Sequence, residues 1–271
     1  MLIAILSFLA ILALLILAHE LGHLITAKSL GVKVEEFGLG YPPRLFAVKR
    51  GETTYSVNLV PLGGFTKMAG EEDPKIPGSL ASKSTGTRVL VLSAGSIMNA
   101  LLPILLFSMA FMIPHDMVVG QVQVEEVASG SPAEGAGIES GDIILKIDPH
   151  PVQNICVLQR YIYLNLGSEI TIQLQKDESI QETAQLTPRW NPPQGQRAIG
   201  ITASMLDPSI ISQSYPFWEA IPLGMRTCVE TLVLFKNEIE SWFVRGALPQ
   251  LAGPVGIAQM TGEVAKAGLS P

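Results

Sequence analysis

The stretch that decides the fold is residues 2–27, which read LIAILSFLAILALLILAHELGHLITA. Over residues 2–18 the only polar side chain is that of Ser7, and helix-compatible sequence continues to the end of the stretch. An apolar segment of this length crosses the hydrocarbon core of a bilayer as an α-helix. A cleaved secretory signal is the alternative, but no Lys or Arg precedes the apolar run, whereas such signals begin with a basic segment. We therefore predict a transmembrane helix over residues 1–28.

The composition of the whole chain agrees with a membrane protein. Of its 271 residues, 48% are hydrophobic and only 15% are charged, and the mean hydropathy is +0.36. Disordered proteins and ordinary soluble enzymes are more polar than this. The 18 basic and 24 acidic residues give a net charge of −6, and no basic face is interleaved with aromatic residues, so no nucleic-acid partner is expected. Cys156 and Cys228 are too few and too far apart to predict a disulfide framework or a cysteine metal site.

Two further segments are candidates for membrane contact. Residues 89–113 contain no charge, which predicts a second transmembrane helix. In residues 216–246, apolar residues recur at spacings of three and four, whereas charged residues occupy the other positions. This pattern predicts an amphipathic helix, which could lie on the membrane surface or pack within a bundle; only the family resemblance described below implies a third transmembrane helix here.

The distribution of basic residues predicts the orientation. Between residues 27 and 88 there are nine basic and six acidic residues, whereas residues 115–215 contain five basic and twelve acidic residues. Loops rich in Lys and Arg face the cytoplasm. We therefore expect the loop 29–88 to be cytoplasmic and the domain 116–214 to be extracytoplasmic.

The loop and the domain differ in their predicted structure. Short β-prone runs separated by Gly and Pro predict β-hairpins in the loop, and its polar residues 71–87 predict an exposed segment. In the domain, a capping box at Ser131-Pro132-Ala133-Glu134 predicts the start of a short helix. A second helix is expected over residues 152–166. Strands are expected over residues 122–127, 143–147 and 170–174, so the domain is α+β.

The residues with the clearest chemical meaning are His19-Glu20-Leu21-Gly22-His23, an HExxH pattern at the end of the first predicted helix. Residues four apart lie on one helix face, so both imidazoles can bind one Zn²⁺, and Glu20 can accept a proton from a metal-bound water. The alternative is a polar helix end wetted by water and headgroups. However, ionisable groups inside a spanning segment are costly and are usually functional.

A hydrolytic zinc site needs a third protein ligand, and the sequence does not identify one. His115 and His150 belong to the predicted extracytoplasmic domain and are interpreted as surface residues. Glu71, Glu72 and Asp73 lie in the polar loop, where solvation is their expected role.

Several motifs in order resemble a known family. They are the HExxH in the first helix, Pro61-Leu62-Gly63-Gly64-Phe65-Thr66-Lys67-Met68, Gly95-Ser96-Ile97-Met98-Asn99, the run from Gly130 to Ile144, which looks like a PDZ domain, and the run from Gly253 to Gln259. Together they resemble the site-2 intramembrane zinc metalloproteases, in the manner of the regulator of sigma-E protease. The resemblance implies a polytopic α-helical membrane protein with a cytoplasmic β-hairpin loop and one inserted α+β PDZ domain.

The resemblance also implies roles for residues. His19 and His23 would be zinc ligands, Glu20 the general base, and Gly38, Gly40 and Asn99 substrate-binding residues. The implied activity is endopeptidase cleavage of single-pass membrane proteins near the cytoplasmic face, in regulated intramembrane proteolysis. Implied partners are the lipid bilayer, anti-sigma factors or remnant signal peptides, and a peptide at the PDZ domain. The implied location is the bacterial inner membrane, with several passes.

The sequence departs from the family pattern in two places. Ser96 stands where the family usually has Pro, which leaves the second helix less kinked. The family's third ligand is an Asp in an Asp-Gly motif on a later helix, whereas residues 247–271 would precede that helix. We therefore expect a truncated chain that lacks the third ligand and is inactive as given. A non-catalytic, membrane-anchored PDZ module that binds peptides is the alternative function.

Overall fold

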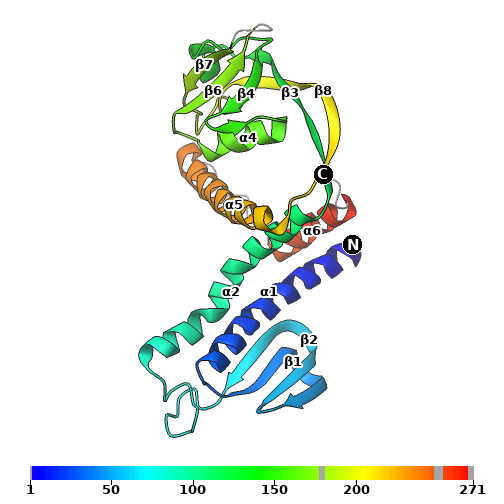
Figure 1. Ribbon diagram of the computed structural model, residues 1–271, viewed down its shortest axis with the longest axis vertical. Coiled ribbons are helices and arrows are strands. Elements are labelled where there is room, and N and C mark those ends of the chain that lie inside the picture. Colours follow the sequence, from blue (N-terminus) through cyan, green and yellow to red (C-terminus); the bar gives the residue numbers. More distant parts are fainter. Residues whose placement is uncertain (1, 177–180, 247–252, 268–271) are drawn as a thin grey trace. The chain divides into compact units, whose positions relative to one another are not determined.

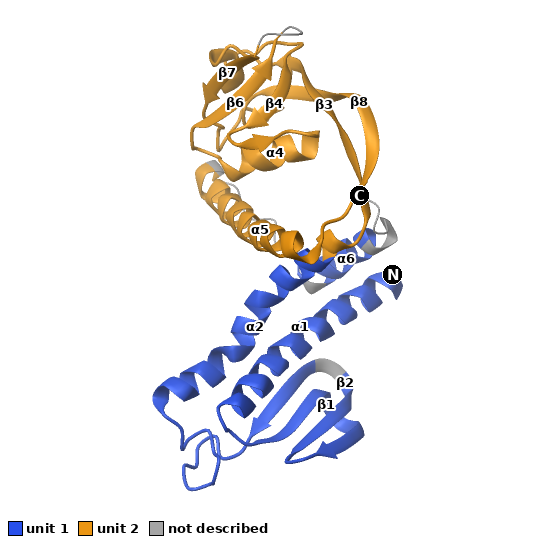
Figure 2. Cartoon of the chain, viewed as in Figure 1, with its two compact units in different colours: residues 1–109, 252–269 blue, residues 110–251, 270–271 orange. Residues whose placement is uncertain are grey.

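The computed structural model describes residues 2–176, 181–246 and 253–267, which fall into two compact units (Figures 1 and 2). The first unit contains α1 (Leu2–Ser29), β1 (Val34–Arg50), β2 (Thr53–Met68), most of α2 (Thr85–Met112) and α6 (Pro254–Ala267). The second unit contains the strands β3 to β8 with α3, α4 and α5, and it begins in the last turn of α2. Residues 247–252 and 268–271 of the expected C-terminal segment lie outside the described residues.

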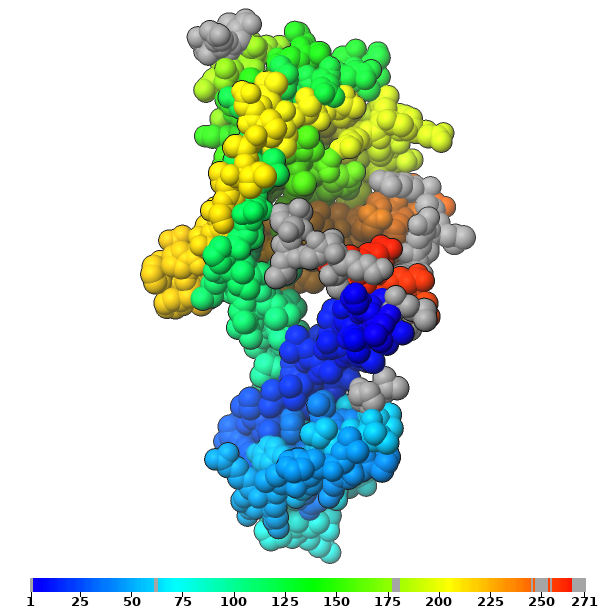
Figure 3. All heavy atoms as spheres, turned by 90° about the vertical axis from the view of Figure 1, so that its right-hand side faces the viewer, coloured from blue at the N-terminus to red at the C-terminus, as the bar shows by residue number. Residues whose placement is uncertain are grey.

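Two of the described helices, α1 and α2, are long and apolar enough to cross a membrane. Only 6% of the apolar window of α1 and 22% of that of α2 is buried inside the protein. A helix in the core of a soluble domain would instead be covered by neighbouring elements. Figure 3 shows the side chains of α1, in dark blue, open on one face. The exposed apolar surface of both helices therefore suits a lipid environment.

The predicted hairpins form a single β1–β2 pair that folds back on itself. Residues 44–50 of β1 pair with residues 53–58 of β2, which also pair with residues 36–39 on their other side. Residues 34–39 pair in turn with residues 64–68 at the end of β2. The two bent strands thus make four antiparallel rows. Residues 44–50 and 64–68 are the outer rows within the described part of the chain.

A small core joins this sheet to the two long helices. Buried apolar residues come from the last turns of α1, the start of β1, the end of β2, the following loop and the first third of α2. The loop contributes Leu80, which is 4% exposed, and Ser79 is fully buried. The expectation that residues 71–87 are an exposed loop is therefore wrong at this point, because Leu80 packs into the core and α2 already begins at Thr85.

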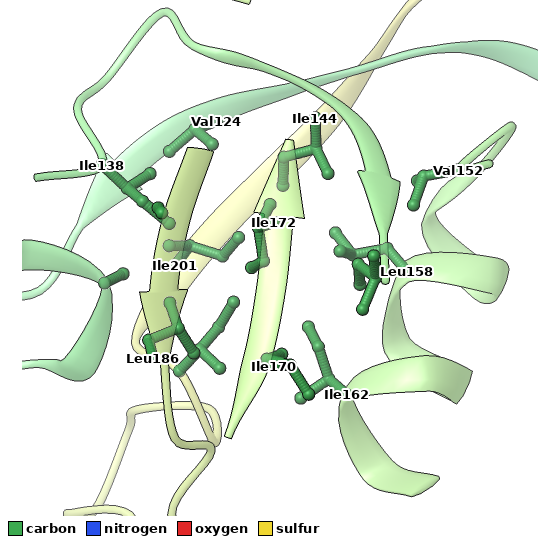
Figure 4. Packing of buried hydrophobic residues seen from close by; sticks show 14 of the residues in the cluster. Val124, Ile138, Ile144, Val152, Leu158, Ile162, Ile170, Ile172, Leu186 and Ile201 are labelled. Carbon is green, nitrogen blue, oxygen red and sulfur yellow. The ribbon is translucent and has the colours of Figure 1, made fainter. Parts of the chain in front are cut away.

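The second unit is built on a six-stranded antiparallel sheet. Its order is β7-β6-β4-β3-β8, with β5 paired to β4. The strands are β3 (His115–Val127), β4 (Ile143–Ile147), β5 (His150–Pro151), β6 (Ile170–Gln175), β7 (Gln181–Leu186) and β8 (Ile201–Gln213). Alternate residues of β6 are buried, and they pack with α4 (Ile155–Leu164) and α3 (Pro132–Gly135) into one core (Figure 4). The result is an α+β domain, as the patterning predicts.

The helix starts in this domain follow local capping chemistry. The backbone N–H of Glu134 donates to the hydroxyl of Ser131, and the Glu134 carboxylate accepts from the N–H of Gly130, so the predicted helix start is confirmed. Asn154 caps α4 by accepting from the N–H of Val157. This cap starts α4 three residues later than the predicted 152–166, because the N–H of Val152 still donates to the carbonyl of Leu145 in β4.

The long helix α5 (Phe217–Arg245) follows the sheet and has distinct faces. The helix is not among the described helices that pass as membrane spans, because charged residues recur along it. Its buried residues include Ala220, Asn237 and Ser241. The Asn237 side chain donates to the carbonyls of Tyr163 and Leu164 at the end of α4.

Candidate metal centre

The candidate metal site lies in the second half of α1. His19 and His23 are one helical turn apart, and their Nε2 atoms lie 3.2 Å from each other. Two nitrogens that each lie about 2.1 Å from a tetrahedral zinc ion are roughly 3.4 Å apart. The separation of the two ring nitrogens therefore fits a shared zinc ion.

The position of His23 is set by α2. Its Nδ1 lies 2.8 Å from the backbone carbonyl oxygen of Val91. Since a carbonyl only accepts, Nδ1 carries the proton and Nε2 keeps its lone pair for a metal. Val91 itself is fully buried in the core that joins the two helices.

The side chain of Asn99, also on α2, contacts the Nδ1 atom of the other histidine, His19. Its side-chain amide nitrogen lies 3.5 Å from His19 Nδ1, and its Oδ1 is buried with no hydrogen-bond partner in the described part of the chain. A half-turn of the amide group would bring Oδ1 against His19 Nδ1 and leave Nε2 of His19 unprotonated. Both rings can therefore present Nε2 to the same point.

Glycines on both helices leave the space that the two imidazole rings occupy. A Cβ atom on Gly95 of α2 would lie 2.5 Å from Nε2 of both His19 and His23. One helical turn along α1, a Cβ on Gly22 would lie 2.5 Å from the carbonyl oxygen of Ala94. Glycine at both positions lets the helices cross directly at the histidine pair.

Glu20 is held from the opposite side by the end of β2. The hydroxyl of Thr66 donates to Glu20 Oε2 over 2.7 Å. A Cβ on Gly64 would lie 2.9 Å from Cγ of Glu20, so this strand passes directly over the carboxylate. These contacts fix a carboxylate beside the histidine pair, as general-base chemistry requires.

A cleft of about 250 Å³ opens onto these groups. Its lining combines α1, the two ends of the folded hairpin and α2, through Leu15, Ile16, His19, Glu20, Tyr41, Gly63, Gly64 and Asn99. The side chain of Tyr41 lies against Gly63. The cleft thus combines apolar side chains, those of Leu15 and Ile16, with the polar groups of His19, Glu20 and Asn99 that a peptide bond could reach.

The two glycines expected to bind substrate lie inside the hairpin. Gly38 pairs with Ser56 on one side and with Phe65 on the other, so it belongs to an inner row of the sheet. The carbonyl of Gly40 accepts a hydrogen bond from the side chain of Asn58. Neither glycine lines the cleft. A peptide strand therefore cannot add at Gly38, and both residues shape the hairpin.

No group of three His, Cys, Asp or Glu side chains that could hold a metal is found within residues 2–176, 181–246 and 253–267. The described site thus offers two candidate ligands, His19 and His23. His150 is not a simple surface residue, because it stacks on Tyr161 at 4.4 Å and contacts Arg226. His115 contacts the carbonyl oxygen of Ile113. Glu71 accepts a hydrogen bond from the N–H of Met68.

Sequence reasoning missed three contributors to the site. Thr66, Gly64 and Gly95 belong to the motifs that carry the resemblance, but their roles depend on contacts with α1 that the sequence alone does not show. The carbonyl of Val91 and the ring of Tyr41 carry no sequence signal.

Comparison with known proteins identifies relatives of the whole chain. The model of peptidase family M50 matches residues 7–271. Proteins from Clostridium acetobutylicum and Clostridium perfringens, each named "Putative zinc metalloprotease", are 34% and 33% identical to this chain. The first similarity covers 98% of this chain and 75% of the relative, and the second covers 94% and 73%.

Two further matches cover part of the chain. Zinc metalloprotease Rip1 of Mycobacterium tuberculosis is 32% identical over 70% of this chain and 55% of its own length. A solved PDZ domain of an SdrC-like protein from Listeria monocytogenes is 25% identical over 30% of this chain and 85% of its own, with a TM-score of 0.27. From the match to residues 7–271 and the clostridial relatives, we conclude that this chain belongs to peptidase family M50, the site-2 zinc metalloproteases.

Proposed function

We propose that this chain provides the first part of the active site of a zinc-dependent endopeptidase that cleaves membrane-protein substrates within or beside the bilayer. The observation that carries the proposal is the convergence of Nε2 of His19 and His23, 3.2 Å apart, on a helix whose apolar surface is exposed. Glu20 lies beside them in the same cleft. Family membership supports the same chemistry.

His19 and His23 would hold the zinc ion, with a third ligand from outside the described residues. When bound there, zinc would supply Lewis-acid chemistry, making a water molecule more acidic and a peptide carbonyl more reactive. Glu20 takes the proton from the attacking water and passes it to the leaving amine. Thr66 keeps the Glu20 carboxylate at the rim of the cleft during these steps, through its hydrogen bond to Oε2.

We further propose that the substrate binds as an extended strand along the outer row at the end of β2. Residues 64–68 pair with β1 on one side, and no described strand pairs with their other side. Gly63 and Gly64 lie at the start of this row and line the cleft with Glu20. A strand added at this edge would bring a peptide carbonyl to the histidine pair, and pairing would offset the unwinding of a helical substrate.

The proposed cellular setting follows the charge distribution. The Lys- and Arg-rich loop between α1 and α2 would face the cytoplasm of a bacterial inner-membrane protein with several passes, and the α+β domain would lie outside. We propose that this domain is a PDZ domain that binds peptide ends. Single-pass membrane proteins, such as anti-sigma factors or remnant signal peptides, are the proposed substrates in regulated intramembrane proteolysis.

The test is cleavage in vesicles of a tagged reporter with one transmembrane segment, by a complete form of the protein that supplies the third zinc ligand. Glu20→Gln should abolish cleavage but leave zinc content and helicity unchanged. Glu72→Gln, which changes an exposed carboxylate of the loop, is the matched control and should remain active. Cleavage by Glu20→Gln would refute the assignment of the general base.

The alternative is a non-catalytic peptide-binding module, favoured by the finding of only two metal ligands within the part of the chain that the structure describes. Zinc measurement separates the two functions. A complete form of the protein that binds no zinc, and whose His19→Ala variant is unchanged in every property, would favour the binding module. Stoichiometric zinc that is lost in His19→Ala favours the enzyme.

A further inference from the structure

A second cleft of the first unit lies at the C-terminal end of α1, and it shares no lining residue with the metal site. Its volume is about 690 Å³. Three segments of the chain line it: the end of α1 with the start of β1, the β1–β2 turn, and the loop that follows β2. The lining residues are Lys28 and residues 31–34, 50–53 and 77–78.

The buried part of this cleft is held by contacts among the three segments. Val32 and Val34 are each 2% exposed and belong to the core that joins the sheet to α1 and α2. The hydroxyl of the buried Thr53 donates to the carbonyl of Val34 over 2.9 Å. The N–H of Lys33 donates to the carbonyl of Gly78, also over 2.9 Å. The cleft is therefore part of the packed structure, and its outer side chains project from a fixed backbone.

The outer side chains of the cleft are mostly positively charged. Lys28, Lys33 and Arg50 line it. A fourth cation reaches its edge, because Nζ of Lys83 lies 3.3 Å from the position that a Cβ on the lining residue Gly31 would take. Among the described lining residues, the only carboxylate is that of Glu52. A concave surface with four positive charges and one negative charge attracts anions.

The four cations are not neutralised by the protein. Elsewhere between α1 and α2, Arg44 and Lys67 form ion pairs with neighbouring glutamates. Within the described residues, none of the four cations forms such a pair. Nζ of Lys28 instead donates to the hydroxyl of Tyr55 over 2.9 Å and lies 5.3 Å from the centroid of its ring. The cluster can therefore bind an anion from outside the chain.

The position of the cleft along α1 indicates which anions it can meet. At 1.5 Å per residue, Lys28 lies about 39 Å along the helix axis from Leu2. A bilayer with its headgroup regions is about 40–45 Å thick. Ile25, one turn before Lys28 on the same face, is 55% exposed, so the helix surface changes from apolar to basic at this turn. A helix that crosses the bilayer from Leu2 therefore places Lys28 among lipid headgroups.

We propose that this cleft binds a phosphate-bearing anion, and that its occupant in the membrane is the headgroup of an anionic phospholipid. Arg50 can donate two parallel hydrogen bonds to phosphate oxygens, whereas the lysines act as compact positive charges. Basic pockets beside the ends of membrane helices bind such headgroups. The acyl chains would lie along the exposed apolar face of α1 that includes Ile25. Free phosphate has the same chemistry, so the test must separate the two sources.

The test is direct binding to the full chain, immobilised by an affinity tag in a neutral detergent at fixed ionic strength. The probe is radiolabelled dioctanoyl phosphatidylglycerol, and the unlabelled competitors are the same lipid, dioctanoyl phosphatidylcholine and inorganic phosphate. The test variant combines Lys33→Gln with Arg50→Gln. The matched control combines Lys49→Gln with Lys75→Gln, because it removes two positive charges from exposed positions between the same helices that do not line the cleft.

One phosphatidylglycerol should bind per chain, and phosphatidylcholine should not displace it. The test variant should bind roughly 25-fold more weakly, about fivefold for each charge removed, whereas the control should be close to the unchanged chain. Displacement by unlabelled phosphatidylglycerol but not by inorganic phosphate would support the lipid as occupant. Equal displacement by inorganic phosphate would support the anion site but overturn the lipid as its occupant.

Two results would overturn the whole proposal. If the test variant and the control bind equally well, the charges of the cleft do not form a site. If phosphatidylcholine displaces the probe as well as phosphatidylglycerol does, or if binding does not saturate, the cleft does not select an anion. The readout requires neither zinc nor cleavage, so its failure is separate from failure of the proposed function.

Discussion

A single methyl group at Gly95 should destroy the metal site without harming the helix that carries it. In Gly95→Ala, the new Cβ would lie 2.5 Å from Nε2 of His19 and from Nε2 of His23. Carbon and nitrogen atoms that are not bonded pack at about 3.5 Å, so each ring must retreat by about 1 Å. Zinc–ligand distances vary by only about 0.2 Å among real sites. The two rings therefore cannot accommodate the methyl group and still direct both Nε2 atoms at one zinc ion.

The expected effect is a loss of zinc affinity of at least about 10- to 100-fold, the range seen when only the supporting shell of a metal site is altered. The helix itself should not weaken. Alanine is favoured over glycine in a helix interior by about 1 kcal/mol, so α2 should be as helical as before or more so. A loss of zinc with preserved helicity would then locate the effect at the histidine pair.

Gly86→Ala is the matched control, because it makes the same change in the same helix where a Cβ would meet nothing within 4 Å. Zinc affinity is measured on the full chain in detergent by competition with a fluorescent chelator, and helicity by circular dichroism. If Gly95→Ala binds zinc as tightly as Gly86→Ala, the two imidazoles do not share a metal at this point, and the assignment of the site fails.

Three further predictions follow from other contacts. Thr66→Val should lower kcat by roughly tenfold or more, because a hydrogen bond to a carboxylate contributes about 1.5–3 kcal/mol. Thr66→Ser keeps the hydroxyl and should retain activity. Equal rates for the two variants would contradict the positioning role of Thr66. Burial, and then the charge of Arg226, lower the pKa of His150, so the unfolded chain binds the proton more readily than the folded chain does. The melting temperature should therefore fall as the pH drops below about 6.5, and it should fall less in His150→Gln. Asn237→Leu should lower the melting temperature of the second unit, because two carbonyls at the end of α4 lose their donor; an unchanged value would show that water replaces it.

The sequence predicts elements better than it predicts pairings. Hydropathy and the absence of charge locate α1 and α2 to within a few residues, because a long apolar run has few other stable structures. The folding of β1 and β2 into four rows does not follow from the hairpin pattern, since residues 36–39 pair with two separate parts of β2. Helix α6 was not expected, because its Gly253-Pro254 start is typical of a turn as much as of a helix.

The site shows the same division between local and distant contributions. The spacing of His19 and His23 predicts a shared face because the helical period is local information. The groups that position them come from Val91, Gly95 and Asn99, some seventy residues or more away in the chain, and the group that holds Glu20 comes from Thr66. No periodicity connects these positions, so only the packed structure shows that they meet.

Three glycines, which lack a side chain, allow these distant groups to meet. Gly22, Gly64 and Gly95 come from three elements, and each lies where a Cβ would be within 3 Å of a neighbouring element or of a functional side chain. In lipid, helices gain little from burying apolar surface against one another, so they associate by close packing at small residues. That same close packing confines two imidazoles and one carboxylate to the few ångströms in which a metal and a water could be shared. Substituting any of the three glycines should therefore impair metal binding or catalysis before it impairs folding, and the order of these losses in a denaturation and activity series tests that coupling directly.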